Sequence, residues 1–389
     1  MADTVSAGEG SGAGDARSGS LEGTGVVSSV SAGAGSLTGA GLGSIGDASS
    51  GSLMESASGA AGGVGSLASE GARSGDFIGA GRYAPSPTGD FHLGNLRTAL
   101  LAWALARNAG LGFIMRMEDL DERSRPEHGE HQLADLAALG IEWDEPIVYQ
   151  SEQLTQYDAA FAELEARGLL YECYCTRKDL AQVASAPHRP PGSYPGTCRD
   201  LTAAEREAGR AKLAGMQRGP ALRLRTDVTE LAVVDEILGE YTGAVDDVVI
   251  KRGDGVYSYN FVAVFDDGQE CITQVVRGDD LLPSTPRQVY LQRVLGIPTP
   301  KYFHVPMVFN AEGVRLAKRD GAVTMRDLAK FGWEPADILE LLGRSLGMRG
   351  VRTATEFAEA LTLERLRQGP WLLDPVSLAA GPGAVLRGQ

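Results

Sequence analysis

The sequence predicts an α/β fold whose core is a parallel sheet. Residues 77–84 form a short apolar stretch typical of a strand, and a turn-rich segment follows it. Apolar residues then recur at helical spacing from about Gly94 to Asn108, and a second strand is expected at 113–118. This strand–loop–helix–strand order is the βαβ unit of parallel sheets. With 389 residues, 43% of them hydrophobic, the chain can also bury a large core.

Further segments extend the same pattern toward the C-terminus. The expected elements are a helix at 153–167, strands at 221–226, 246–251, 256–265 and 271–276, a helix from 285, a strand at 303–309 and helices from about 325 onward. Two helix starts look like capping boxes, in which a hydroxyl and a Glu or Gln three residues later satisfy free backbone N–H groups. They are Thr285 with Gln288 and Thr353 with Glu356.

The first 75 residues differ in composition from the rest of the chain. Gly, Ser and Ala account for 50 of them, and the segment has no aromatic residue and no proline. Such a segment cannot bury enough apolar surface to offset the roughly 1–2 kcal/mol per residue that backbone ordering costs. We therefore predict a disordered, flexible tail at 1–75 and a folded protein after it.

The charge and hydropathy of the chain limit the classes of partner. The chain has 36 Lys and Arg against 51 Asp and Glu, and this net charge of -15 argues against nonspecific nucleic-acid binding, which needs local cations. No stretch approaches the roughly 18 consecutive apolar residues of a membrane span, and no secretory signal pattern is present. We expect a cytoplasmic protein with no membrane partner.

The segment from Arg82 to Asn95 has the chemistry of an anion site. A strand end leads through a tight turn into a helix whose free N–H groups point back at the turn, where they and the helix dipole favour an anion. Gly89 and Gly94 let a ligand approach the backbone closely. His92 could donate to a phosphate at the helix start. An ordinary capping turn with a solvated histidine is the alternative.

Three of the four cysteines, Cys173, Cys175 and Cys198, lie within 26 residues. Three thiolates at this spacing suit one tetrahedral Zn²⁺ ion, whereas a disulfide scaffold is excluded for a chain of this size. The chemistry leaves the fourth ligand open, and His188 has the commoner ligand type. Reduced cysteines without a metal are the alternative. Cys271 lies in a strand pattern, so we expect a thiol in the core.

Residues 82–89, Arg-Tyr-Ala-Pro-Ser-Pro-Thr-Gly, resemble the first signature of the class I aminoacyl-tRNA synthetases in its glutamyl form. Residues 315–319, Arg-Leu-Ala-Lys-Arg, resemble the mobile lysine loop of that class. Three further motifs lie between them in family order: Arg116–Asp121, Tyr259–Asn260 and Val276–Asp280. Two positions depart from the family pattern. Asn95 replaces a second histidine, and Ala317 replaces the serine of the lysine loop, which removes a hydroxyl.

The resemblance covers about residues 80–345 and implies a Rossmann-like catalytic domain with an inserted zinc-binding subdomain and a short helical C-terminal part. It divides the chain into a tail at 1–75, the first half of the catalytic domain at 76–170, the zinc-binding subdomain at 171–245, the second half with the lysine loop at 246–325, and a helical region at 326–389.

The resemblance also implies the role of individual residues. Activation of a carboxylate by ATP puts extra negative charge on phosphorus, so such a site must position the reactants and stabilise charge. L-glutamate would be bound by Arg82, Ser86, Glu118, Tyr259 and Arg277, with the two arginines on its side-chain carboxylate and Glu118 on its ammonium group. ATP, with Mg²⁺, would be bound by His92, Gly94, Asn95 and Lys318, and His92 and Lys318 would be catalytic. The zinc motif of the short relatives favours Tyr194 as the ligand beside Cys173, Cys175 and Cys198.

The length after the lysine loop favours one branch of the family. Only 71 residues follow Lys318, fewer than the helical anticodon-binding region of full-length glutamyl-tRNA synthetases. The resemblance thus favours the short glutamyl-queuosine synthetases, monomers that activate glutamate without tRNA and esterify it to queuosine in the anticodon loop of tRNA(Asp). Arg97, Arg123, Arg125 and Arg319 could contact its phosphates.

Three other functions remain open at this point. A shortened glutamyl-tRNA synthetase would charge tRNA(Glu) at its acceptor end. A nucleotidyltransferase of the same fold would also use the histidine-containing helix start and ATP, but would not need arginines for a carboxylate. A non-enzymatic zinc- and RNA-binding module would leave the paired ATP motifs without a purpose.

Overall fold

The structure is a computed structural model that describes residues 78–176, 178–180, 194–316 and 323–388. The predicted tail at 1–75 lies outside the described residues, as do Ala317, Lys318 and His188.

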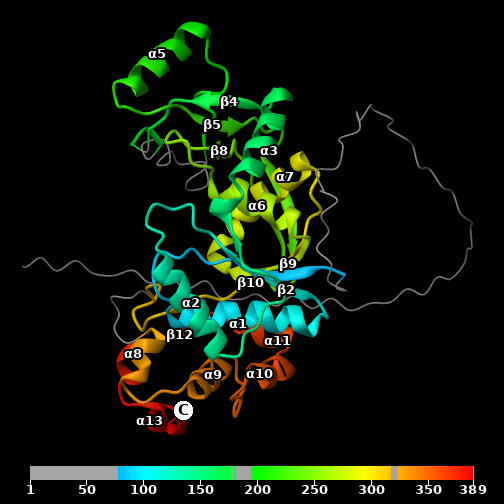
Figure 1. The fold of residues 1–389 in the computed structure, drawn as a ribbon. Coiled ribbons are helices and arrows are strands. Elements are labelled where there is room, and N and C mark those ends of the chain that lie inside the picture. Colours follow the sequence, from blue (N-terminus) through cyan, green and yellow to red (C-terminus); the bar gives the residue numbers. More distant parts are fainter. Residues whose placement is uncertain (1–77, 177, 181–193, 317–322, 389) are drawn as a thin grey trace, which may run out of the picture. The chain divides into compact units, whose positions relative to one another are not determined.

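A seven-stranded mixed sheet is the centre of the fold (Figure 1), in the order β3-β2-β1-β9-β10-β6-β7. Its strands are β1 (Ala80–Tyr83), β2 (Gly112–Met117), β3 (Val148–Tyr149), β6 (Glu230–Asp235), β7 (Gly239–Ala244), β9 (Ile272–Gly278) and β10 (Lys301–Val305). All neighbours pair in parallel except β6 and β7, which form an antiparallel hairpin at one edge. The predicted parallel core is therefore confirmed, with an antiparallel edge strand added.

The chain order of the parallel strands creates a switch point beside β1. The chain moves outward from β1 to β2 and β3, then returns to place β9 and β10 on the other side of β1. Loops that leave β1 and β9 therefore depart in opposite directions, which opens a crevice at the carboxyl ends of these strands. Every residue of β1 and β2 is buried, as expected for central strands covered on both faces.

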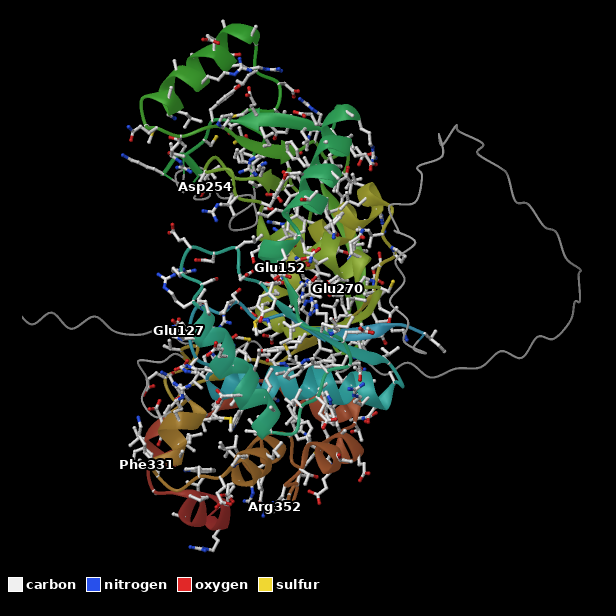
Figure 2. The ribbon with its side chains drawn as sticks, in the orientation of Figure 1. Glu127, Glu152, Asp254, Glu270, Phe331 and Arg352 are labelled. Atoms are coloured by element: carbon white, nitrogen blue, oxygen red, sulfur yellow. The ribbon has the colours of Figure 1, made fainter. Side chains whose placement is uncertain are left out.

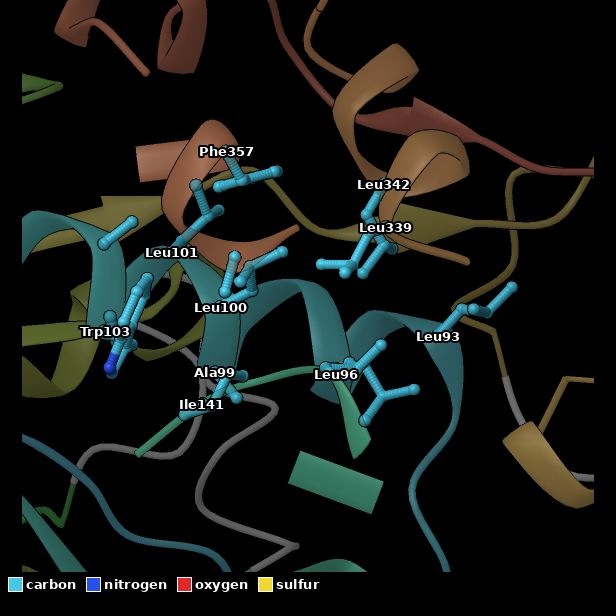
Figure 3. Packing of buried hydrophobic residues seen from close by; sticks show 14 of the residues in the cluster. Leu93, Leu96, Ala99, Leu100, Leu101, Trp103, Ile141, Leu339, Leu342 and Phe357 are labelled. Atoms are coloured by element: carbon cyan, nitrogen blue, oxygen red, sulfur yellow. The ribbon is translucent and has the colours of Figure 1, made fainter. Parts of the chain in front are cut away.

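Helix α1 (Leu93–Asn108) packs under the sheet and is buried on nearly all sides. Its small residues permit a close approach to β1, because a Cβ on Gly81 would lie 2.8 Å from the Cβ of Ala106. On its other side, α1 contacts α9 (Pro335–Arg344) and α10 (Ala354–Ala360), where leucines of α1 meet Leu339, Leu342 and Phe357 (Figure 3). The predicted helix at 94–108 is confirmed.

Helices α3 (Leu154–Ala166), α6 (Tyr259–Gln269) and α7 (Thr285–Leu295) form a second apolar cluster. Tyr157 packs edge-on against Phe265, with ring centroids 5.7 Å apart. The prediction of a strand at 256–265 is wrong, because α6 covers most of it. A short apolar run buried on all sides has no periodicity that separates a helix from a strand. The missed signal is Ser258, whose side chain accepts the N–H of Phe261 and caps the helix.

Three further sequence predictions need correction. Thr285 does not cap α7: it is the first residue of the helix, and its hydroxyl bonds to other side chains. Cys271 is exposed in a turn with φ of 53° and is not a core thiol. The strand expected at 303–309 is broken at Pro306, which has no N–H for the sheet, into β10 and β11 (Val308–Phe309). The Thr353 capping box of α10 is confirmed.

A separate three-stranded antiparallel sheet contains one of the clustered cysteines, Cys173, at the end of its first strand. It consists of β4 (Leu170–Cys173), β5 (Ala221–Leu224) and β8 (Val249–Lys251), and α5 (Ala203–Ala214) lies near it in Figure 1. The sequence analysis places a domain boundary between residues 245 and 246. The sheets divide the chain differently, because β6 and β7, which precede the boundary, belong to the large sheet, whereas β8, which follows it, belongs to the small one.

The remaining elements surround this framework. They are α2 (Pro126–Ala138), the 3₁₀ helices η1 (Gln150–Glu152) and η2 (Asp279–Ser284), α8 (Met325–Ala329), α11 (Leu363–Leu366), β12 (Trp371–Leu372), α12 (Pro375–Leu378) and α13 (Pro382–Gly388). The C-terminal region is thus mainly helical, as predicted, apart from the pairing of β12 with β11. No helix in the described part of the chain combines the length and apolar composition that a bilayer crossing requires.

Candidate active site

A cavity of about 360 Å³ opens at the carboxyl ends of β1 and β9, beside the first turn of α1. Its size lies in the range of small-ligand pockets. Seven residues singled out in the sequence line it: Arg82, His92, Gly94, Asn95, Glu118, Tyr259 and Arg277. The fold thus gathers side chains nearly 200 positions apart in the sequence at the switch point of the sheet. Ser86 is not among the lining residues and is exposed, and Lys318 lies outside the described part of the chain.

His92 both caps α1 and lines the cavity. Its Nδ1 accepts the backbone N–H groups of Gly94 at 3.0 Å and Asn95 at 3.3 Å. A neutral ring that accepts at Nδ1 carries its proton at Nε2, so His92 presents a donor there. Gly94 is required beneath the ring, since a Cβ would lie 2.8 Å from Cε1 of His92. The helix cap is therefore confirmed, but the backbone N–H groups that the sequence analysis expects to be free are bonded to His92 and Val323. An anion at this place would have to be bound by the Nε2–H of His92 and the helix dipole.

Asn95, one of the two departures from the family pattern, stabilises the same turn. Its side-chain oxygen accepts the backbone N–H of His92 at 3.2 Å, which completes a reciprocal capping box. The Tyr83 hydroxyl donates to the Asn95 carbonyl at 3.1 Å and connects this turn to β1. The helix start is therefore held in place from both sides.

Arg277, at the end of β9, is buried and held by neutral partners. Its Nε donates to Nε2 of His304 at 3.1 Å, and one Nη donates to the Thr285 hydroxyl at 2.9 Å. Its guanidinium also lies 5.2 Å from the ring of Tyr302. No described carboxylate forms an ion pair with Arg277, so its positive charge faces the cavity without a counter-ion.

Asp235 fixes the proton of His304. The Asp235 carboxylate lies 2.7 Å from Nδ1 of His304 and also accepts the backbone N–H of that residue. Nδ1 therefore carries the proton, and Nε2 is left as the acceptor for Arg277. Burial lowers the pKa of His304, and this keeps the ring neutral beside the guanidinium.

Arg82, at the end of β1, belongs to a buried ion cluster. Its Nε lies 3.2 Å from Asp267, which also accepts from Arg116 at 2.8 Å. Arg116 is fully buried and donates over 2.8 Å to Glu270, which is itself buried and is labelled in Figure 2. Removal of one member of such a cluster leaves an uncompensated buried charge, so its geometry is strongly constrained.

Glu118, at the end of β2, is the carboxylate of this cluster that lines the cavity. One of its oxygens lies 3.7 Å from Arg116. Burial raises the pKa of Glu118 to about 7, although the positive charges of Arg116 and Arg82 act in the opposite direction. A cation that bound in the cavity would favour its ionised form.

Several residues that bond to the cavity residues, directly or through a neighbour, were assigned no role in the site by the sequence analysis. They are Arg116, Asp235, Asp267, Thr285 and His304. A usable signal existed for Arg116, which interrupts an otherwise apolar strand, and for Asp267, which follows the apolar run of α6. A charge at a core position needs a buried partner. The partners themselves come from distant segments, and no local pattern reveals them.

Of the described arginines that were expected to contact tRNA, two are exposed and one is buried. Arg97 is buried, and its Nε donates to the Ser345 hydroxyl at 2.9 Å. The prediction of a phosphate contact is therefore wrong for Arg97, because its guanidinium is bonded inside the protein. Arg123 is exposed and pairs with a neighbouring aspartate. Arg125 is exposed, and Arg319 lies outside the described residues.

The cysteine cluster has the spacing of a tetrahedral metal site. The ligand atoms of Cys173, Cys175 and Cys198 lie within 4.8 Å of one another, and the sulfurs of Cys175 and Cys198 are 3.6 Å apart. Sulfurs on a tetrahedral Zn²⁺ with bonds of about 2.3 Å would be separated by about 3.8 Å. The Tyr194 hydroxyl lies 3.4 Å from the Cys173 sulfur. These residues fit a zinc ion.

The sheet order, the capped start of α1 and the cavity lined by arginines together have the architecture of a class I tRNA synthetase catalytic domain. The family model described as tRNA synthetases class I (E and Q), catalytic domain, matches residues 80–378, and the chain belongs to this family.

Curated relatives agree with this membership, and a solved structure shares the fold. The Glutamyl-Q tRNA(Asp) synthetase of Nocardia farcinica is 55% identical over 295 residues, which cover 76% of this chain and 93% of that protein. A glutamate–tRNA ligase of Nitrosospira multiformis is 39% identical over 309 residues, which cover 76% of this chain and 64% of that protein. A glutamate tRNA ligase from Elizabethkingia meningosepticum shares the fold, with a TM-score of 0.61 at 24% identity over 77% of this chain and 68% of that one.

Proposed function

We propose that this protein activates L-glutamate with ATP in the absence of tRNA and transfers the glutamyl group to queuosine at the wobble position of tRNA(Asp). The observation that carries the proposal is Arg277, a buried guanidinium that lines the cavity and forms no ion pair with any carboxylate of the described residues. An anionic side chain of the substrate would supply the missing charge in a bidentate pair. The similarity to proteins named Glutamyl-Q tRNA(Asp) synthetase supports the choice of tRNA.

In the activation step, the side-chain carboxylate of glutamate would lie between Arg277 and Arg82, and its ammonium group against Glu118. An oxygen of the α-carboxylate attacks the α-phosphorus of ATP, the bond to the β-phosphate breaks, and pyrophosphate leaves. The Nε2–H of His92 and the positive end of the α1 dipole would hold the phosphates. Lys318 would close on their other side.

In the transfer step, a hydroxyl of the queuosine diol attacks the glutamyl carbonyl, and AMP leaves. This diol is chemically similar to the ribose cis-diol that related enzymes acylate, so the same activated glutamyl intermediate can react with it.

Zn²⁺, bound by the three cysteines with Tyr194 as the proposed fourth ligand, would stabilise the small antiparallel sheet. The chain would act as a cytoplasmic monomer, as the sequence analysis expects.

Activation is tested by ATP–pyrophosphate exchange with glutamate and no tRNA. We expect exchange from the wild type, and Arg277→Ala should raise the glutamate requirement far more than the ATP requirement, because only glutamate would contact Arg277. A matched control is Arg123→Ala, an exposed arginine outside the cavity, which should change neither requirement. Equal losses for both substrates would count against the assignment of Arg277.

Transfer is tested with labelled glutamate on three substrates: tRNA(Asp) that contains queuosine, the same tRNA without queuosine, and tRNA(Glu). We expect label only on the first. Label on tRNA(Glu) that is removed together with its 3′ end would instead support a glutamyl-tRNA synthetase, the function named for the relative from Nitrosospira multiformis.

A further inference from the structure

A second group of possible metal ligands lies outside the cavity and the cysteine cluster. Asp90 belongs to the loop between β1 and α1, two residues before the helix cap, and His128 and His131 lie on α2. Residues three apart on a helix share a face, so both imidazoles point to the same side of α2. In the described part of the chain, these three residues and the three cysteines are the groups whose ligand atoms converge closely enough to hold an ion.

We propose that Asp90, His128 and His131 form a second site for a divalent transition-metal ion, with two imidazole nitrogens and one carboxylate oxygen as ligands. The three ligands take no part in the proposed activation of glutamate, and the proposed metal site does not depend on that activity.

The distances from Asp90 to the two histidines match those between ligands of one ion, and all three ligand atoms lie within 4.8 Å of one another. Oδ1 of Asp90 lies 3.2 Å from Nδ1 of His128 and 3.0 Å from Nδ1 of His131. Ligands at about 2.1 Å from an ion are about 3.0 Å apart at right angles and about 3.4 Å apart in a tetrahedron. Both distances between Asp90 and the histidines lie in this interval. The two rings are inclined by 71° with centroids 6.4 Å apart, so they can approach one ion from different directions.

The loop and the helix are held together by contacts other than the two histidines. Buried Gln132 donates its side-chain amide to the carbonyls of Ser86 at 3.1 Å and Gly89 at 2.7 Å. The backbone N–H of Arg125 donates to the Pro87 carbonyl at 2.9 Å. The geometry of the cluster is therefore established before an ion binds, which lowers the ordering cost of binding.

The ligand types and the surrounding charges decide which ion fits. Two imidazoles disfavour Mg²⁺ and Ca²⁺, which prefer oxygen, and favour Zn²⁺, Co²⁺ or Ni²⁺. Asp90 and the neighbouring Asp135 supply negative charge, while the Arg326 guanidinium lies 3.9 Å from the other oxygen of Asp90. The two histidine side chains and Asp90 are 33%, 35% and 26% exposed, so water can complete the coordination sphere.

The experiment is a Co²⁺ titration of the full chain after one equivalent of Zn²⁺ has been added for the cysteines. Cobalt bound by nitrogen and oxygen gives weak visible bands without the sulfur-to-metal charge transfer of a thiolate site. We expect one such binding event in the wild type. It should be lost in His128→Gln/His131→Gln, and His131→Ala alone should weaken it by at least about 10-fold.

The matched control is Glu127→Gln/Glu130→Gln, which removes exposed charges from the same helix and should leave Co²⁺ binding unchanged. Circular dichroism should show the same fold for all variants, because Gln132 keeps its contacts. No binding event in the wild type at millimolar Co²⁺ would mean that Asp90 only accepts hydrogen bonds from the two histidines, and would overturn the proposal. An event of unchanged affinity in the double histidine variant would overturn it as well.

Discussion

Replacement of His304 by leucine tests whether His304 positions Arg277 in the proposed glutamate site. Leucine fills much of the volume but cannot accept the hydrogen bond that Nε of Arg277 donates over 3.1 Å. A hydrogen bond to a charged group contributes about 1.5–3 kcal/mol, and each 1.4 kcal/mol corresponds to a factor of ten. If Arg277 binds the substrate carboxylate, we expect the KM for glutamate to rise about 10- to 100-fold.

The expected effect is confined to one substrate. The side chain of His304 bonds to Arg277, Thr285 and Asp235, none of which is proposed to hold ATP, so the KM for ATP should change by less than about 2-fold. Asp235 would lose one partner in the variant but keep the backbone N–H groups of Ile237 and Leu238. We therefore expect the fold to survive, which thermal unfolding followed by circular dichroism would verify.

The assay is ATP–pyrophosphate exchange with each substrate varied in turn, and His304→Gln is the conservative control. The glutamine amide oxygen can accept from Arg277, so this variant should recover much of the glutamate affinity. Equal rises in both KM values, or a folded glutamine variant no better than the leucine variant, would refute the argument that His304 positions Arg277.

Three further predictions concern other parts of the protein. Glu118, whose pKa burial raises to about 7, must be ionised to bind an ammonium group, so the KM for glutamate should fall as the pH rises from 6 to 8. Glu118→Gln should abolish this dependence; a dependence that persists would point to Glu270, whose pKa is also raised to about 7 by burial. Elemental analysis of protein purified without chelator should find zinc bound through Cys173, Cys175 and Cys198, and Cys173→Ser/Cys175→Ser should lose it; zinc-free wild-type protein would contradict the site. Deletion of residues 1–75 should leave glutamate activation unchanged within error, because the proposed contacts begin at Arg82; a large loss would assign the tail a structural role.

The sequence by itself determined the parts of this protein that depend on local chemistry. The strand, turn and helix from residue 80 to 108 could be predicted because helix spacing, glycine positions and a histidine cap act over a few residues. The cysteine spacing likewise indicated a metal site that the geometry of the sulfurs fits. Short apolar runs are less informative: the sequence predicts a strand where α6 forms, because burial on all sides removes the periodicity.

The tertiary structure alone decided which charges are paired. Arg82 and Arg277 look equivalent in the sequence, yet Arg82 is bound to Asp267 while Arg277 is held by neutral His304 and Thr285. The sequence likewise did not indicate the cluster of Asp90, His128 and His131, because Asp90 lies on a loop and the two histidines on a helix that packs against it only in the fold. Electrostatic interactions act through space, so a counter-ion more than a hundred residues away leaves no local pattern in the sequence.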